Sequence, residues 1–247
     1  MADNEDNGPP KKLRRLATEK PSFGFEMVEV RVGEDRVGED SDDGEAKTFH
    51  VHKDLLTQHS DFFRAAFTGD WKERADGVIR LPEDEVEAFE QFYWFVYTGS
   101  LFTIREGDHG VGEDNHPTDK EFGRLAAAWA LGNKLQCTPF KDALTDGLIA
   151  KGLKERSWPY GIYAAINLTA ARSAGIRRFL IDLAALTWSE NYFAEMEFTT
   201  TEFLHDLVLA LAKARAHGVS KSKPWENAGC RYHEHGEDKQ CYKKVFG

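Results

Sequence analysis

Two segments near the start of the chain alternate apolar and charged residues, one at residues 27–33 and the other at 47–52. A period of two is typical of a strand with one buried face, so both segments are predicted to be strands. A shorter apolar run at residues 78–81 predicts a third strand. The apolar positions of the first two strands are Met27, Val28, Val30, Val32, Phe49 and Val51.

Helical spacing replaces this alternation between and after the strands. Leu55 and Leu56 predict a short helix. Ser60 is a favourable N-cap for the next helix, because its hydroxyl can accept a hydrogen bond from a backbone N–H of the first turn. Pro82 is predicted to open a longer helix and Gly99 to close it. One stripe of that longer helix carries Val86, Phe89, Phe92 and Val96.

The second half of the chain is predicted to be mainly helical. Residues 118–121 and 199–202 each have the Thr-x-x-Glu pattern of a capping box, which marks the start of a helix. Pro139 is predicted to begin a further helix, and residues 175–188 repeat apolar side chains at helical spacing. The strongest amphipathic signal follows the second capping box, at Phe203, Leu204, Leu207, Val208 and Leu211.

This order of few strands and many helices predicts an α+β fold with a small sheet and a helical body. Residues 1–21 are rich in Asp, Asn, Gly, Pro and Lys and are expected to be disordered. The predicted parts of the chain are a tail at 1–21, a first domain at 22–150, a helical region at 151–229 and a Cys/His-containing tail at 230–247.

Composition narrows the functional classes. The 247 residues carry a formal net charge of -10, and the basic run 11–15 is either a nuclear-import signal or part of a solvated tail. An acidic chain without a basic face is not expected to bind nucleic acid directly. No apolar run is long enough for a membrane helix, and three cysteines do not make a secreted disulfide framework. We therefore expect a soluble protein of the cytoplasm, the nucleus or both.

Three stretches carry a family resemblance: FHVHKDLLTQHSDFFRAAF, VIRLPEDEVEAFEQFYWFVYTGSL and LAAAWALGNKLQCTPFKDAL. In this order and spacing they resemble the BTB/POZ family, and most closely the small BTB proteins of fungi, over residues 25–150. The resemblance implies a helical cluster flanked by a small sheet, followed by a mainly helical extension. The matching positions are Phe49, His52, Leu56, Ser60, Phe63, Leu81, Phe89, Tyr97 and Gly99.

Members of this family use the fold for protein association. The resemblance therefore implies a protein-interaction module that forms homo- or hetero-oligomers. Two alternatives stay open, namely a substrate adaptor of a cullin-based ubiquitin ligase and a transcriptional regulator that acts through partners. The expected partners are proteins, first a second copy of this chain and, for the adaptor, a cullin, with no direct nucleic-acid or membrane partner.

Four consecutive aromatic residues are the candidate partner surface. Successive residues of a helix are turned by about 100°, so at least one of the four should lie outside the buried stripe. The alternative is that neighbouring helices surround this helix and bury it on all sides. The four residues are Phe92, Tyr93, Trp94 and Phe95.

No enzyme is predicted. The sequence contains none of the glycine-rich phosphate-binding motifs and no G-x-S-x-G nucleophile motif, so no catalytic residue is assigned. His50 and His52 point to the same side of a strand, but no third ligand at metal-binding spacing accompanies them. Together with His59 they are interpreted as structural residues.

The sequence near the C-terminus offers a candidate metal site with the spacing C-x2-H-x-H-x5-C. Thiolates and imidazoles are the ligands that zinc prefers in structural sites. The close HxH pair is tight for one tetrahedral ion, so His235 is either a ligand or an outer-shell residue. A reversible disulfide and a plain polar tail are the alternatives, and apart from zinc no cofactor is expected. The four candidate ligands are Cys230, His233, His235 and Cys241.

Overall fold

The computed structural model describes residues 23–34, 46–68, 77–106, 120–155, 170–190, 200–217, 222–237 and 239–246. The predicted tail at 1–21 lies outside these ranges. The strands are β1 (Met27–Val32), β2 (Lys47–His52) and β3 (Val78–Leu81). The helices are α1 (Lys53–His59), α2 (Asp61–Thr68), α4 (Val86–Thr98), α5 (Glu121–Lys134), α6 (Thr138–Glu155), α8 (Gly175–Thr187), α10 (Thr201–His217) and α11 (Tyr242–Val245).

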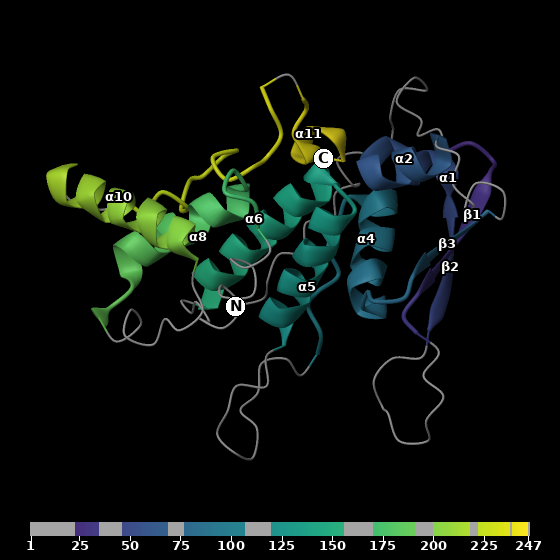
Figure 1. Cartoon of the computed structure of the whole chain (residues 1–247), viewed down its shortest axis with the longest axis horizontal. Helices are drawn as coiled ribbons and strands as arrows, with labels where there is room; N and C mark the ends of the chain where they lie inside the picture. Colours follow the sequence, from purple (N-terminus) through teal and green to yellow (C-terminus); the bar gives the residue numbers. More distant parts are fainter. Residues whose placement is uncertain are drawn as a thin grey trace, which may run out of the picture.

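The elements follow one another along the long axis of the molecule. Figure 1 shows the sheet at one end, α4, α5 and α6 in the middle, and α8 with α10 at the other end. The short helix α11 returns from the C-terminal side to lie over the middle of the body. The prediction of an α+β fold with a small sheet and a helical body is confirmed.

The three strands form one sheet in the order β2-β1-β3, with β1 in the centre. β1 runs antiparallel to β2, where Val30 lies opposite Phe49, and parallel to β3, where Val30 lies opposite Ile79. The alternation seen in the sequence matches the structure, because the apolar side chains on one face of the sheet are buried. They are Val28, Val30, Val32, Phe49, Val51, Ile79 and Leu81.

A continuous column of aromatic rings joins the sheet to the helices. On α4, Phe89, Phe92 and Phe95 are fully buried. Phe89 lies 4.8 Å from Phe49 of β2, measured between ring centroids, and Phe95 lies 5.1 Å from Phe140 of α6. Such ring pairs stabilise a core beyond the area they bury.

Two helix ends agree with the sequence analysis. The backbone N–H of Phe63 donates to Ser60 Oγ at 3.2 Å, so Ser60 is the N-cap of α2. Ser60 Oγ in turn donates to the carbonyl of Leu135 at 2.6 Å and ties this corner to the end of α5. Gly99 has φ of 70° and ends α4 in the left-handed conformation that favours glycine.

One predicted helix start is wrong, and the two predicted capping boxes rest on residues 118 and 199, which lie outside the described ranges. Pro82 lies in a turn closed by a hydrogen bond from Asp84 N–H to the carbonyl of Leu81, and α4 begins only at Val86. α5 begins at Glu121, whose side chain contacts Thr103 and Lys151. At the start of α10, Phe203 N–H donates to Thr200 Oγ1 at 3.2 Å.

The C-terminal half buries less of its apolar surface. α8 packs Ile176, Phe179, Leu180 and Leu183 into the core, as its pattern predicts. Of the amphipathic positions of α10, Phe203 and Leu207 are buried, whereas Leu204, Val208 and Leu211 are 44%, 62% and 38% exposed. Among the described helices, none is both long and apolar enough to cross a bilayer.

Candidate functional site

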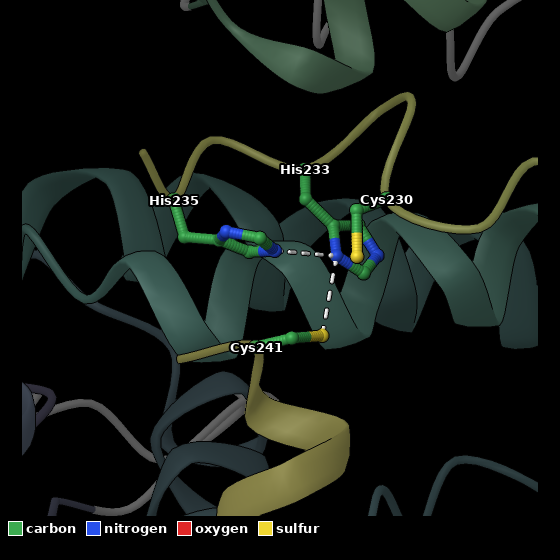
Figure 2. Close-up of side chains that lie close together, drawn as sticks. All are labelled: Cys230, His233, His235 and Cys241. Atoms are coloured by element: carbon green, nitrogen blue, oxygen red, sulfur yellow. Dashed lines mark hydrogen bonds between the residues drawn. The ribbon is translucent and has the colours of Figure 1, made fainter. Parts of the chain in front are cut away.

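The four cysteine and histidine residues predicted as metal ligands come together in space. Figure 2 shows their side chains pointing toward one another, with three of them on a loop beside α6 and Cys241 at the start of α11. One ligand atom from each lies within 4.8 Å of every other. His233 and Cys241 are buried and Cys230 is exposed, so the cluster is open to solvent on one side only. The group is Cys230, His233, His235 and Cys241.

Asp146 of α6 fixes the orientation of His233. Its Oδ2 lies 2.9 Å from His233 Nε2, and it also accepts hydrogen bonds from Tyr242 Oη and Lys243 Nζ at 2.6 and 2.8 Å. Burial of Asp146 favours its neutral form, but these three hydrogen bonds outweigh burial and hold the pKa of the carboxyl below its usual value. A carboxylate only accepts, so the proton on His233 lies at Nε2 and its Nδ1 presents a lone pair.

His235 is oriented in a similar way by the backbone. Its Nδ1 lies 3.1 Å from the carbonyl oxygen of Gly236, which can only accept a hydrogen bond. In neutral His235 the lone pair is therefore on Nε2, and Nε2 lies 3.3 Å from Nδ1 of His233. Two lone pairs that face each other at this distance need a proton or a metal ion between them.

The sulfur atoms complete the cluster. Cys241 Sγ lies 3.5 Å from the same Nδ1 of His233. Burial raises the pKa of the Cys241 thiol, and the neighbouring thiol of Cys230 raises it further. In the ligand-free cluster both effects disfavour the thiolate, whereas a bound cation would favour it.

The loop that carries these ligands is anchored to two helices. On α6, Asp142 Oδ1 accepts a hydrogen bond from Glu234 N–H at 2.6 Å, and Lys141 forms an ion pair of 2.5 Å with the Glu234 carboxylate. On α8, Arg178 donates to the carbonyl of His233 at 2.8 Å. The ligand loop around His233 and Glu234 is therefore packed against the body rather than forming a free tail.

Sequence reasoning missed the acidic residues of α6 that support the cluster. Asp142 and Asp146 lie four positions apart, so they share one face of the helix. This face was assigned no role because the stretch reads as an ordinary mixed helix. The only available signal was a pair of carboxylates on a helix whose other face is apolar. Their partners lie about ninety residues away in the chain, so no local pattern could identify them.

The histidines near β2 have no metal partner. His50 is exposed, and Nδ1 of His52 lies 2.7 Å from the hydroxyl of Tyr97, whose oxygen also accepts from His52 N–H. The ring of His59 lies 5.3 Å from Phe246. Within the described ranges only the C-terminal cluster gathers three or more candidate ligands.

The predicted partner surface at residues 92–95 needs correction. Phe92 and Phe95 are fully buried in the aromatic column, so they cannot contact a partner. Tyr93 is half-buried, and only Trp94 is clearly exposed, at 46%. The hundred-degree turn between successive residues explains this result, because the apolar stripe of α4 cannot include all four positions.

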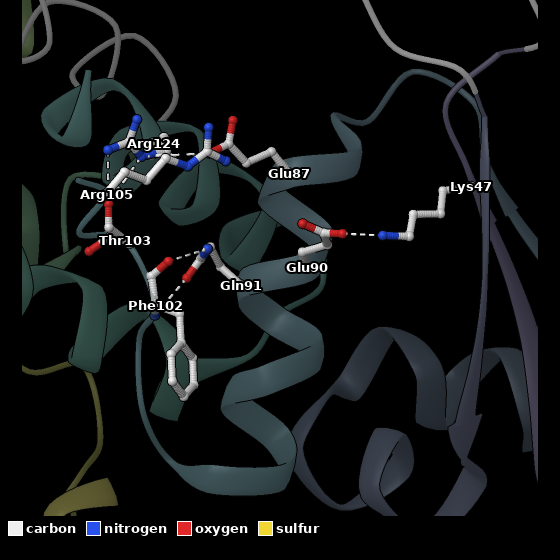
Figure 3. A network of polar contacts seen from close by, with 8 residues as sticks. All are labelled: Lys47, Glu87, Glu90, Gln91, Phe102, Thr103, Arg105 and Arg124. Atoms are coloured by element: carbon white, nitrogen blue, oxygen red, sulfur yellow. Dashed lines mark hydrogen bonds and ion pairs between the residues drawn. The ribbon is translucent and has the colours of Figure 1, made fainter. Parts of the chain in front are cut away.

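The extended segment 101–105 supplies exposed apolar side chains beside Trp94. Phe102 is 56% exposed and its ring lies 6.0 Å from that of Trp94, edge to face. Gln91 of α4 holds the segment in place with two hydrogen bonds: its Nε2 donates to the carbonyl of Phe102 at 3.0 Å, and its Oε1 accepts from Phe102 N–H at 2.9 Å. Figure 3 shows the Phe102 ring pointing away from this pair.

Further polar contacts fix the same segment. Arg124 of α5 donates twice to the carbonyl of Thr103, at 3.1 and 2.9 Å, and Arg105 pairs with Glu87 at 2.6 Å (Figure 3). Thr103 is buried between the two exposed residues Phe102 and Ile104, the latter 69% exposed. We call Trp94, Phe102 and Ile104 the Trp94 surface.

Comparison with known proteins agrees with this arrangement. A family model described as BTB/POZ domain matches residues 41–111. The chain is 40% identical over 62 residues to the ARM repeat protein interacting with ABF2 of Arabidopsis thaliana, which covers 25% of this chain and 9% of that protein. It is 39% identical over 57 residues to the Armadillo BTB Arabidopsis protein 1, which covers 23% of this chain and 8% of that protein.

The match covers less than a tenth of the length of either relative. The family model's range, residues 41–111, includes β2, α1, α2, β3, α4 and the segment that carries Phe102, and it contains all nine positions of the predicted family motif. Those positions form the packed part of this region, apart from His52 and Tyr97, which bond to each other, and Gly99, which ends α4. Residues 41–111 are therefore identified as a BTB/POZ domain, which is a protein-interaction module.

Proposed function

We propose that this chain associates with a second copy of itself through the Trp94 surface of its BTB/POZ domain and has no catalytic activity of its own. The observation that carries the proposal is a fixed apolar surface on a domain of a protein-interaction type. Large aromatic residues are enriched where proteins associate, and exposed apolar patches mark such sites.

The rigidity of the Trp94 surface favours binding. Gln91 is 5% exposed and holds the backbone of Phe102 from both sides, so this stretch of backbone does not have to be ordered when a partner binds. A preorganised backbone loses less entropy on association, and this leaves more of the contact energy for affinity. The backbone of Trp94 is likewise fixed, because it belongs to a helix of 13 residues.

Light scattering of the purified full chain tests self-association. We expect a mass above the 28.0 kDa of the monomer at micromolar concentration. The double variant Trp94→Ser/Phe102→Ser should restore the monomer mass, because it removes both rings of the exposed pair. The matched control is Leu204→Ser/Val208→Ser on α10, which also removes exposed apolar side chains and should leave the oligomer intact. A monomeric wild-type protein at every concentration would contradict self-association.

A second candidate is a substrate adaptor of a cullin-based ubiquitin ligase. An adaptor needs a second surface for its substrate, and the α8–α10 region offers one. Leu204, Val208 and Leu211 form an exposed apolar stripe on α10. A separate cavity of about 600 Å³, which these three residues do not line, lies between α8 and α10. We infer that the adaptor would bind a cullin with its BTB/POZ domain and a substrate with this stripe.

Affinity capture with a purified cullin separates the two candidates. The adaptor predicts that wild type and the Leu204→Ser/Val208→Ser variant both bind the cullin and that only the wild type retains a substrate. A chain that self-associates and fails to bind any purified cullin would leave the first proposal alone. The likeness to small fungal BTB proteins stays a prediction, since the two relatives named above are plant proteins. The role as a transcriptional regulator that acts through partners also stays a prediction.

A further inference from the structure

The Cys/His cluster has no part in the proposed association. It lies at the junction of α6, α8 and α11, and its ligand atoms converge within 4.8 Å. The tautomers set by Asp146 and by the Gly236 carbonyl leave two imidazole lone pairs facing each other at 3.3 Å. A thiol lies 3.5 Å from one of these nitrogens. This convergence of electron-pair donors points to a cation.

We propose that the cluster binds one zinc ion as a closed structural site that fastens the segment 230–246 to α6. Two sulfur and two nitrogen ligands are a set that zinc prefers over calcium or magnesium, which take oxygen ligands. Four protein ligands leave no position for substrate, so the site is structural rather than catalytic. The ligands are Cys230, His233, His235 and Cys241.

Two of the ligand-atom distances already fit a tetrahedral ion, and all of them lie within 4.8 Å. Bonds to zinc of about 2.0–2.3 Å place tetrahedral ligand atoms roughly 3.3–3.8 Å apart. The pair His233–His235 at 3.3 Å and the pair His233–Cys241 at 3.5 Å already have this separation. Although only one residue separates the two histidines, Figure 2 shows both rings reaching the same point. The hydrogen bond from Glu234 N–H to Asp142 holds the intervening backbone in that bend.

An outer shell of partners supports both imidazoles. Metal-binding histidines usually donate their second N–H to a carboxylate or a carbonyl, which fixes the ring and makes it a stronger ligand. His233 has Asp146 in this role and His235 has the carbonyl of Gly236. Asp146 also accepts from Tyr242 and Lys243 of α11, so one carboxylate links α6, the ligand loop and α11.

The segment needs such a fastening because it buries little apolar surface. Among the described residues between Cys230 and Cys241, the only buried large apolar side chain is that of Tyr232, while His233 is buried as a polar group. Beyond α11, Phe246 packs 5.1 Å from Phe95 of the BTB/POZ domain. Zinc therefore holds in place the chain that carries this contact between the C-terminus and the domain.

Metal analysis of the untagged full chain, purified without chelators, tests the proposal. We expect about one zinc ion per chain, as one closed four-ligand site requires. Cys241→Ser should lose most of it, since it removes one thiolate. The matched control is Cys137→Ala, which removes a buried cysteine outside the cluster and should keep the full zinc content. If Cys241→Ser does not fold, Cys230→Ser replaces it, because Cys230 is exposed and its change should be tolerated.

Asp146→Asn tests the positioning role of the carboxylate. Loss of an outer-shell partner typically weakens metal binding by about 10–100-fold, so this variant should release zinc to a competing chromophoric chelator more readily than wild type. Cobalt bound in place of zinc should give a thiolate-to-metal charge-transfer band in wild type, in Asp146→Asn and in Cys137→Ala. That band should weaken in Cys241→Ser, because this variant lacks one thiolate ligand. If Cys241 only supported the fold, the band would keep its intensity.

Three results would overturn the proposal. The first is wild-type protein that carries no zinc and has freely reactive Cys230 and Cys241. The second is a chain whose mass is lower by the two hydrogens lost in a Cys230–Cys241 disulfide. The third is a Cys241→Ser variant that retains the same zinc content as wild type.

Discussion

The BTB/POZ domain and the C-terminal segment 230–246 are ordered by different interactions. In the domain, Phe63, Phe89 and Phe92 are completely buried, and neighbouring ring centroids lie 5.6 to 6.0 Å apart. In the segment, the ligand loop is held by hydrogen bonds and ion pairs to α6 and α8. The hydrophobic core depends mainly on buried apolar area, whereas the ligand loop depends on its polar partners and, in our proposal, on a metal ion.

The two regions meet at one place. Phe246 lies against Phe95 and against the ring of His59, and a Cβ atom added at Gly99 would lie 2.2 Å from Phe246. This close approach is a second reason, besides the positive φ, why α4 ends in a glycine. The comparison therefore predicts that substitutions change stability most inside the domain, less where the segment meets α8, and least where Phe246 meets His59.

Phe63→Ala should have the largest effect. The ring is completely buried against Phe92, so we expect a loss of about 3–5 kcal/mol in the free energy of unfolding. Chemical denaturation measures it, with Phe102→Ala as the control, because Phe102 is mostly exposed and should cost less than about 1 kcal/mol. Equal losses in the two variants would show that burial in the domain does not decide stability.

Gly175→Ala should have an intermediate effect that is specific to the segment. A Cβ atom at this position would lie 1.9 Å from the carbonyl oxygen of Tyr232, so α8 and the ligand loop must move apart. We expect a loss of about 1–3 kcal/mol together with weaker zinc binding.

Gly123→Ala on α5 is the control for that change. Its added Cβ meets nothing within 4 Å, and alanine is the better helix former, so stability should stay the same or rise by up to about 1 kcal/mol. Unchanged zinc affinity in Gly175→Ala would show that the contact with α8 does not support the cluster.

His59→Gln should have the smallest effect, visible as a change in pH dependence. Burial lowers the pKa of His59 from its usual 6.5, so below that pH the unfolded chain binds more protons than the folded chain. Neutral, buried His59 therefore contributes its full stabilisation above pH 6.5, and this stabilisation is lost as the pH falls below 6.5. The charged or titratable groups that line the same hollow are Asp61, Arg64, Asp142, His235, Lys239 and Tyr242.

Denaturation at two pH values on either side of 6.5 checks this prediction, because those other groups are the same in both proteins. The His59→Gln variant should lose less stability on acidification than wild type. Identical pH slopes would mean that the junction with Phe246 does not keep His59 neutral.

The sequence predicted local features of this fold better than distant contacts. The strand alternation, the cap at Ser60 and the end at Gly99 depend on neighbours within a few residues, so pattern was sufficient. The start of α4 was misplaced because a turn after Pro82 delays the helix, and the exposure of Leu204 could not be foreseen because periodicity does not say whether a partner covers each apolar position.

The candidate site was predictable only in part. The spacing of Cys and His residues indicated four ligands, which the fold does bring together. The supporting carboxylates Asp142 and Asp146 come from a helix distant in sequence, and only the folded chain places them beside the ligands. Burial of Phe92 agrees with its place on the predicted apolar stripe, whereas burial of Phe95 follows from the packing of α6, which no local pattern contains.

The central claim is that an apolar core holds the BTB/POZ domain while a metal ion and polar contacts hold the C-terminal segment. Hydrogen exchange of the full chain, measured with and without a zinc chelator, tests this claim most directly. We predict that chelation speeds the exchange of backbone amides in residues 230–246, while α2 and α4 keep their protection. An unchanged exchange of 230–246, or an equal acceleration throughout both regions, would contradict the account.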